Sequence, residues 1–426
     1  MQINKDLTEL VDVGIISEST AENIRNYFLS KEKPQSNRLV IVFGILGAIL
    51  VGLGIILILA HNWDNLSTFT KTILAFIPLL IGQGLCAFTI IKKTDRIVWR
   101  ESSAVFLTFA VGASISLISQ IYNISGDISS FIMTWALLCL PLVYLMKSSA
   151  TSLLFIVGIT YYACETNYFH YPHPENYHYW WLMVLILPFY INKLRLKIND
   201  NFVAFHNWLL PISLIIVLGT LANKAGNLMF IAYMSLFSAY YLLGSSDWFQ
   251  SHKKINNGFK QLGIAGSFYL LLMLSFDSLW KDFRDDHYFD IIITFEIISI
   301  FLTTALALFL LIRKLKKSAI NEVMPFDVSF LLFLLIFVFC INSFLAAVLI
   351  NLMVLAIGIL TIKSGSKKDH LGILNLGLLI ITALIICRFF DTNISFVLRG
   401  ILFILVGFGF FVTNYLMLKR RKTNEK

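Results

Sequence analysis

The sequence predicts an all-α integral membrane protein with about fourteen transmembrane helices, because apolar runs of bilayer-spanning length recur along the chain. Of the 426 residues, 58% are hydrophobic and only 14% are charged, and the mean hydropathy is +0.77. A soluble domain carries about 25% charged residues. A water-soluble core cannot hide this much apolar surface. The Lys and Arg residues also gather in alternate loops, which fixes an orientation with both termini in the cytoplasm.

The first two apolar runs, at 39–60 and 72–91, flank one short polar loop and define a hairpin that the rest of the chain repeats. About 20 residues at 1.5 Å rise match a hydrocarbon core of about 30 Å. The stretch 326–362 is too long for one span and short for two, and Ile341–Ser343 is its expected turn. The further spans are expected at 102–121, 129–146, 151–164, 179–191, 202–218, 227–243, 259–276, 290–312, 326–340, 343–362, 371–387 and 395–418.

Residues 1–38 form the only sizeable soluble piece and predict a small cytoplasmic helical hairpin. Gly14 is a natural C-cap for the first short helix, and Ser17 is a plausible N-cap for the second. This hairpin either packs on the membrane domain as a collar or docks a cytoplasmic partner. The polytopic domain is expected over 39–418, with a basic cytoplasmic tail at 419–426. No cleavable signal peptide is visible, so 39–60 is expected to be a retained span.

Loop charge supports this topology. With the N-terminus inside, all but six of the 34 Lys and Arg residues fall on the cytoplasmic side, as the positive-inside rule requires. The net charge of +9 is thus explained by topology, with anionic lipid as counter-charge, and nucleic acid is excluded as a partner. The six outer residues are Lys71, Lys224, Lys281, Arg284, Arg388 and Arg399.

The five cysteines all fall inside expected spans and form no CxxC pair, which favours small buried apolar side chains. Histidines at 170, 173 and 178, together with Glu175, have the chemistry of metal ligands, but Pro172 and Pro174 interrupt them and no standard spacing is met. The sequence therefore predicts neither a metal site nor a cofactor.

Two stretches carry a family resemblance. Residues 7–24 read LTELVDVGIISESTAENI, and a Gly-rich span ending in Ala-His-Asn-Trp follows. With the closing Arg-Phe-Phe-Asp and Leu-Arg-Gly-Ile-Leu-Phe, the chain resembles a bacterial family of predicted multi-pass membrane proteins, catalogued as domain of unknown function two-one-five-seven. The motifs that carry the resemblance span roughly residues 7–90. It implies a bacterial inner-membrane protein and no particular activity.

A polar cluster stands at the outer end of the first span, at His61, Asn62, Trp63 and Asp64. His and Asp titrate or bind cations, and Asn adds donors and an acceptor. The alternative is a structural plug in which Trp anchors the interface and the polar groups cap carbonyls. His206-Asn207-Trp208 repeats three of these residues.

Charged residues at the end of the chain suggest an anion or lipid-headgroup site. Arg388 and Asp391 are three residues apart, and Arg399 enters the last span from the same side. Together they have the donors of a bidentate anion clamp. The alternative is an ion pair that locks the last hairpin.

Glu296 is the candidate for proton coupling. It is expected six residues, about 9 Å, into the span at 290–312, with Ser299 and Thr303 on the same face. A carboxyl at that depth is costly to ionise. The alternative is a protonated Glu hydrogen-bonded between helices.

The third span carries a stripe of small and polar residues on one face, which suits either tight helix packing or the lining of a pathway. Its members are Thr108, Gly112, Ser116, Ser119, Gln120 and Asn123.

These features favour a transporter or flippase-like protein with proton coupling, acting on a lipid-linked or small anionic substrate. One alternative is an envelope sensor or assembly scaffold that signals through the N-terminal hairpin. Another is a membrane-embedded enzyme acting on a lipid-linked substrate at the outer face, with His61, Asp64 and Asp391 as its chemical groups. No catalytic residue is assigned, because the chain has no P-loop, HExxH or GxSxG motif.

Overall fold

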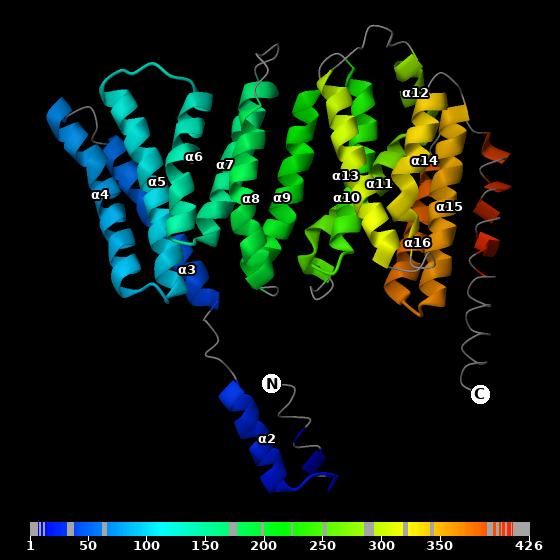
Figure 1. Cartoon of the computed structure of the whole chain (residues 1–426), viewed down its shortest axis with the longest axis horizontal. Helices are drawn as coiled ribbons and strands as arrows, with labels where there is room; N and C mark the ends of the chain where they lie inside the picture. Colours follow the sequence, from blue (N-terminus) through cyan, green and yellow to red (C-terminus); the bar gives the residue numbers. More distant parts are fainter. Residues whose placement is uncertain are drawn as a thin grey trace. The chain divides into compact units, whose positions relative to one another are not determined.

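The computed structural model describes most of the chain as helices (Figure 1). The described residues are 7, 10, 11, 13–31, 38–61, 66–169, 177–196, 200–222, 225–249, 254–284, 294–317, 323–340, 345–389 and parts of 395–411. No strand occurs among them. The chain divides into two compact units, Met1–Phe155 and Ile156–Lys426.

The all-helical membrane class is confirmed at the level of length and apolarity. Within the described ranges, eight helices are long and apolar enough to cross a bilayer. Two shorter apolar helices, Val42–Val51 and Pro325–Cys340, add to them. Fourteen spans and the inside-outside alternation stay predictions. The eight are Thr68–Lys92, Ile97–Ile121, Ile128–Leu145, Asn201–Leu221, Gly226–Gly244, Phe295–Lys317, Leu345–Lys367 and Leu371–Phe389.

The N-terminal caps occur where the sequence predicts them. Gly14 has φ +72°, a conformation that glycine adopts without strain, and its N–H donates to the Val11 carbonyl at 3.0 Å. Helix α2 (Glu18–Lys31) follows, and Thr20 N donates to Ser17 Oγ at 3.3 Å. Ser17 therefore satisfies a first-turn donor of α2.

In the first unit, helix α5 (Ile97–Ile121) is the central element. It packs against α3 (Arg38–His61), α4 (Thr68–Lys92) and α6 (Ile128–Leu145). The close approach of α4 to α5 depends on glycine, because a Cβ at Gly82 of α4 would lie 3.2 Å from Leu107 Cα of α5. Small residues at such contacts are typical of packed transmembrane helices, which gain little from the hydrophobic effect.

A buried carboxylate connects α5 to the start of α7 (Ser149–Asn167), the helix that crosses the boundary between the units. Glu101 is 1% exposed. It accepts hydrogen bonds from Ser149 N and Ala150 N, both at 2.9 Å, and from Ser148 Oγ at 2.6 Å. Thr151 N donates to Ser148 Oγ at 3.2 Å. The first donors of α7, which have no partner within the helix, are thereby satisfied.

In the second unit, helix α10 (Met229–Gly244) is the core. It packs against α9 (Asn201–Leu218), α11 (Gly258–Met273), α13 (Phe295–Lys317) and α14 (Pro325–Cys340). The remaining helices are α8 (His178–Leu196), α12 (Asp277–Arg284), α15 (Leu345–Lys367) and α16 (Leu371–Phe389), with 3-10 turns at Gly219–Leu221, Gly226–Leu228 and Lys254–Asn256.

The ambiguous stretch 326–362 contains two helices, not one. Helix α14 ends at Cys340 and α15 begins at Leu345, and the two pack against each other. The turn expected at Ile341–Ser343 lies outside the described residues. Helix α8 contains Pro188 and continues to Leu196, so it is longer than the predicted 179–191.

We predict that Glu101→Ala lowers the free energy of unfolding by about 3 kcal/mol, because three donors lose their acceptor in a buried site. Thermal unfolding of the full chain in detergent measures this. Asp95→Ala, at an exposed turn before α5, is the control and should leave stability unchanged. Equal stability of Glu101→Ala and the control would contradict the role given to Glu101.

Candidate functional site

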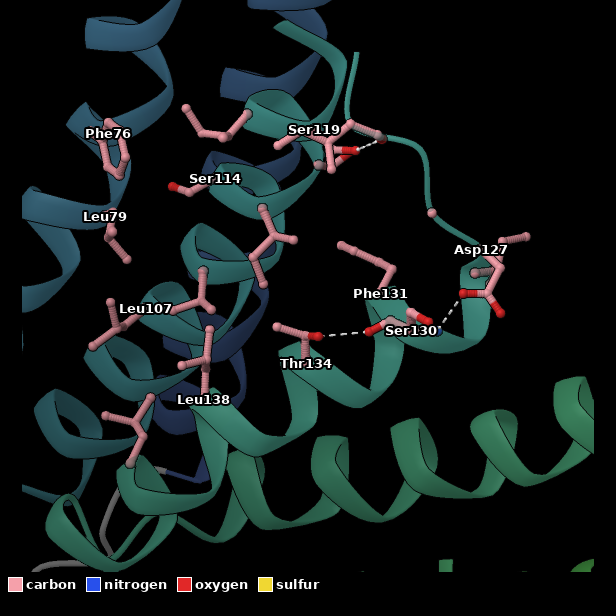
Figure 2. Close-up of a pocket in the computed structure, with 18 of the residues that line it drawn as sticks. Phe76, Leu79, Leu107, Ser114, Ser119, Asp127, Ser130, Phe131, Thr134 and Leu138 are labelled. Carbon is pink, nitrogen blue, oxygen red and sulfur yellow. Dashed lines mark hydrogen bonds between the residues drawn. The ribbon is translucent and has the colours of Figure 1, made fainter. Parts of the chain in front are cut away.

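A groove of about 990 Å³ lies between α4, α5 and α6 in the first unit. Figure 2 shows its polar side chains Ser119, Asp127 and Ser130 near the α5–α6 loop, with Leu107 and Leu138 farther along. The 3.0 Å contact of Thr72 Oγ1 with Tyr122 Oη brings the start of α4 to the same end. The groove therefore has a polar end at this loop.

The polar end is built from short hydroxyl side chains and one carboxylate. Several of these groups are already bonded: Ser114 Oγ donates to the Ala75 carbonyl at 2.7 Å, and Ser119 Oγ donates to the Ile124 carbonyl at 2.9 Å. Thr134 Oγ1 donates to the Ser130 carbonyl at 2.8 Å. Ser116 also lines the groove at this end, and Gln83 lines it farther along α4; both are exposed and available to a ligand.

Apart from the Gln83 amide, which α4 places at the level of Leu107, the far end is apolar. Its walls come from α5 and from the last turns of α6, so they present hydrocarbon and no charge. The residues here are Leu107, Leu138, Pro141, Leu142 and Leu145. A groove with one polar and one apolar end has the character of an amphiphile-binding site.

Asp127 holds the polar end in place as the N-cap of α6. Its Oδ1 accepts a hydrogen bond from Ser130 N at 3.2 Å. Hydrogen bonds from the Ser130 hydroxyl and backbone N–H lower the pKa of the Asp127 carboxyl below its ordinary value of 3.8. Asp127 is therefore ionised at neutral pH.

The predicted stripe on α5 divides into two parts. Ser116 and Ser119 line the groove, whereas Thr108, Gln120 and Asn123 do not. Trp135 of α6 covers the Thr108 end: its Nε1 donates to the Thr108 carbonyl at 2.7 Å. A Cβ at Gly112 would lie 2.8 Å from the same indole. This part of the stripe thus serves helix packing.

Six polar groove residues were not singled out from the sequence: Gln83, Ser114, Ser125, Asp127, Ser130 and Thr134. Asp127 had a readable signal, since an aspartate directly before an apolar run is a typical N-cap. Gln83 and Thr134 sit singly within apolar spans, and only the packing of three helices brings them to one groove.

Glu296 lies elsewhere, in the second unit. Among the described residues, helix α13 begins at Phe295 and Glu296 is in its first turn, while residues 290–293 of the expected span lie outside the described ranges. It is 1% exposed, and its Oε1 accepts from Ala225 N at 3.0 Å. Ser299 and Thr303 hydrogen-bond to carbonyls of their own helix. Its role in proton coupling stays a prediction.

Of the C-terminal charged group, only Arg388 lies within the described residues, and Asp391 and Arg399 lie outside them. Arg388 Nη2 donates to Ser275 Oγ at 3.1 Å, and its guanidinium stacks 4.3 Å from the Phe276 ring centroid. These contacts join the end of α16 to the residues after α11.

The outer cluster cannot be placed, because Asn62, Trp63 and Asp64 lie outside the described residues and only the backbone of His61, the last residue of α3, is described. The repeated motif at 206–208 is structural. Asn207 Nδ2 donates to the Asn256 carbonyl at 2.9 Å, and Trp208 Nε1 donates to the Ile255 carbonyl at 2.8 Å. Both side chains tie α9 to the turn before α11.

Metal-ligand groupings are absent from the part of the chain that the structure describes: no three His, Cys, Asp or Glu side chains gather there. His170, His173 and Glu175 lie outside it. His178 is described, and its Nδ1 lies 3.2 Å from Tyr162 Oη.

A family model described as "Predicted membrane protein (DUF2157)" matches residues 8–152. The part of the chain that this family model matches, residues 8–152, is called the DUF2157 segment below. The resemblance expected from the sequence is confirmed, and it extends past residue 90. No curated protein matches the chain, and no solved structure matches it. The whole groove, from Phe76 to Leu145, lies inside the DUF2157 segment. With its several apolar helices, the chain is a membrane protein.

We predict that the stability of the DUF2157 segment depends on Asp127 at acid pH. Because the folded-state pKa is lowered, the carboxylate stabilises the fold above pH 3.8, and this contribution is lost as the pH falls below that value. The melting temperature of the wild type should therefore fall more steeply on acidification than that of Asp127→Asn, which keeps the capping oxygen. Parallel curves for the two proteins would contradict this assignment.

Proposed function

We propose that this protein binds a membrane amphiphile in the groove between α4, α5 and α6 and acts as a transporter or flippase-like protein. The observation that carries the proposal is the division of the groove into a polar end at the α5–α6 loop and an apolar end along α6. A lipid has the same division between headgroup and tail.

The length of the groove supports a lipid-sized ligand. Its lining residues run along α6 from Ile128 to Leu145. Eighteen helical residues at 1.5 Å rise extend about 27 Å, close to the hydrocarbon thickness of about 30 Å. A tail can therefore lie against the protein over its full length. In the expected orientation, the Asp127 end faces outward across a bacterial inner membrane, and Lys147 lies inside.

An envelope sensor or assembly scaffold is the second candidate, and the second unit supports it. Its polar side chains pair from helix to helix: Ser213 Oγ contacts Thr160 Oγ1 and Tyr179 Oη, both at 2.6 Å. Ser235 also contacts Thr304 at 2.9 Å. Such satisfied pairs suit a rigid bundle, which would signal through the N-terminal hairpin at 1–38.

We predict that filling the groove slows lipid movement. Leu138→Trp places an indole in the groove, whereas Leu137→Trp adds the same bulk on an exposed neighbour that does not line it. The full chain is reconstituted in phosphatidylethanolamine–phosphatidylglycerol vesicles with a fluorescently labelled phospholipid. A membrane-impermeant reductant then reports exchange between leaflets.

Wild type and Leu137→Trp should exchange lipid at similar rates, and Leu138→Trp should be slower by about fivefold or more, because the substrate site is occupied. If the wild type exchanges lipid between leaflets no faster than protein-free vesicles do, transport is contradicted and the scaffold is favoured. Equal rates for the two Trp variants would contradict the role of the groove.

We also propose that Glu296 couples transport to protons. Glu296→Gln keeps an oxygen that can accept from Ala225 N but removes the titratable group. Lipid exchange by the wild type should respond to a transmembrane pH gradient, and exchange by Glu296→Gln should not. An identical response of both proteins would contradict proton coupling at this residue.

A further inference from the structure

The ionisable lining of the groove is negative only, and this charge lies at its polar end. Asp127 is the single ionisable side chain among the described residues that line the groove, and no Lys, Arg or His is among them. The other polar groups of the lining are hydroxyls and the Gln83 amide, and this amide lies farther along the groove, at the level of Leu107. A ligand in the groove therefore meets a negative charge with no compensating cation in the lining.

Asp127 is also held in a defined position. The bond from Ser130 N to its Oδ1 fixes the carboxylate at the start of α6, and the side chain is exposed. Capping a helix requires one acceptor oxygen, which Asn or Ser supplies equally well. The carboxylate adds to this cap a fixed anion at the mouth of the groove, which a neutral cap would not provide.

The depth of the groove matches a single lipid tail. Below Thr134, the lining of α6 is apolar through Leu138, Leu142 and Leu145. An acyl chain in this part would place its headgroup among Ser116, Ser125 and Asp127 at the loop. Hydroxyls there can bond to phosphate or glycerol oxygens, whereas the carboxylate attracts a cation.

We propose that the groove binds a membrane phospholipid whose headgroup carries an ammonium group, with that group beside Asp127 and a tail along α6. This inference rests on the proposed function and names its substrate class. A headgroup with only negative charge, such as phosphoglycerol, would meet Asp127 by like-charge repulsion. The small anionic substrate expected from the sequence therefore does not suit this groove.

The test uses the full chain in uncharged maltoside micelles and three probes with the same photoactivatable tail. Their headgroups are phosphoethanolamine, phosphoglycerol and the hydroxyl of diacylglycerol. Crosslinked peptides are mapped by mass spectrometry, and labelling at 128–145 is quantified against probe concentration. Asp127→Asn keeps the cap without the charge, and Asp95→Asn removes an exposed acid that does not line the groove.

We expect the phosphoethanolamine probe to label the wild type and Asp95→Asn with about three- to tenfold higher affinity than the phosphoglycerol probe, as one partly screened charge pair provides. In Asp127→Asn, this ratio should fall to within about twofold of unity. Millimolar free ethanolamine should not displace the probe, because the tail supplies most of the binding.

Other outcomes separate this inference from the proposed function. Labelling of α6 by all three probes with equal affinity, or a preference for phosphoglycerol, would overturn the ammonium assignment and leave the groove as a lipid site. An unchanged ratio in Asp127→Asn would also overturn it. If none of the three probes labels α4, α5 or α6, the proposed function is overturned. Displacement by free ethanolamine would show that a soluble amine, not a lipid, is the ligand.

Discussion

Helix ends in this protein depend on side chains for their hydrogen bonds, because lipid offers a backbone donor or acceptor no water to bind. Glu101 is the clearest case, since one carboxylate accepts two backbone N–H groups at the start of α7. At the end of α9, the hydroxyls of Tyr233 and Tyr168 donate to the carbonyls of Ile215 and Ile216. A structure without such partners would leave buried polar groups unsatisfied, each at a cost of several kcal/mol.

The two units differ in how their polar side chains find hydrogen-bond partners. In the second unit, polar side chains find partners on neighbouring helices, such as Asn207 Oδ1 with Tyr190 Oη at 2.7 Å. In the first unit, a set of polar side chains gathers along an open groove instead, within the segment that the DUF2157 model matches. The proposed ligand site is placed where the polar groups are not fully used by the protein itself.

Much of the helical organisation could be predicted from the sequence, because apolar runs and helix caps are local signals. The cap at Ser17 and the division of 326–362 into two helices are of this kind. The site was harder to predict. Periodicity correctly places Thr108 and Ser116 on one face of α5, but it cannot show that Trp135 covers the first and leaves the second open. Glu296 shows the same limit, since the sequence cannot show that the Ala225 N–H lies against its carboxyl group.

Pro141 gives the groove a mechanical property. A proline has no N–H to donate to the carbonyl four residues earlier, here that of Leu137, so α6 already lacks one link of its ladder at this point. Bending there breaks no further hydrogen bond. The hydrogen-bond ladder of α6 is therefore weakest beside Leu138 and Leu142, and a bend at this point would change the width of the groove.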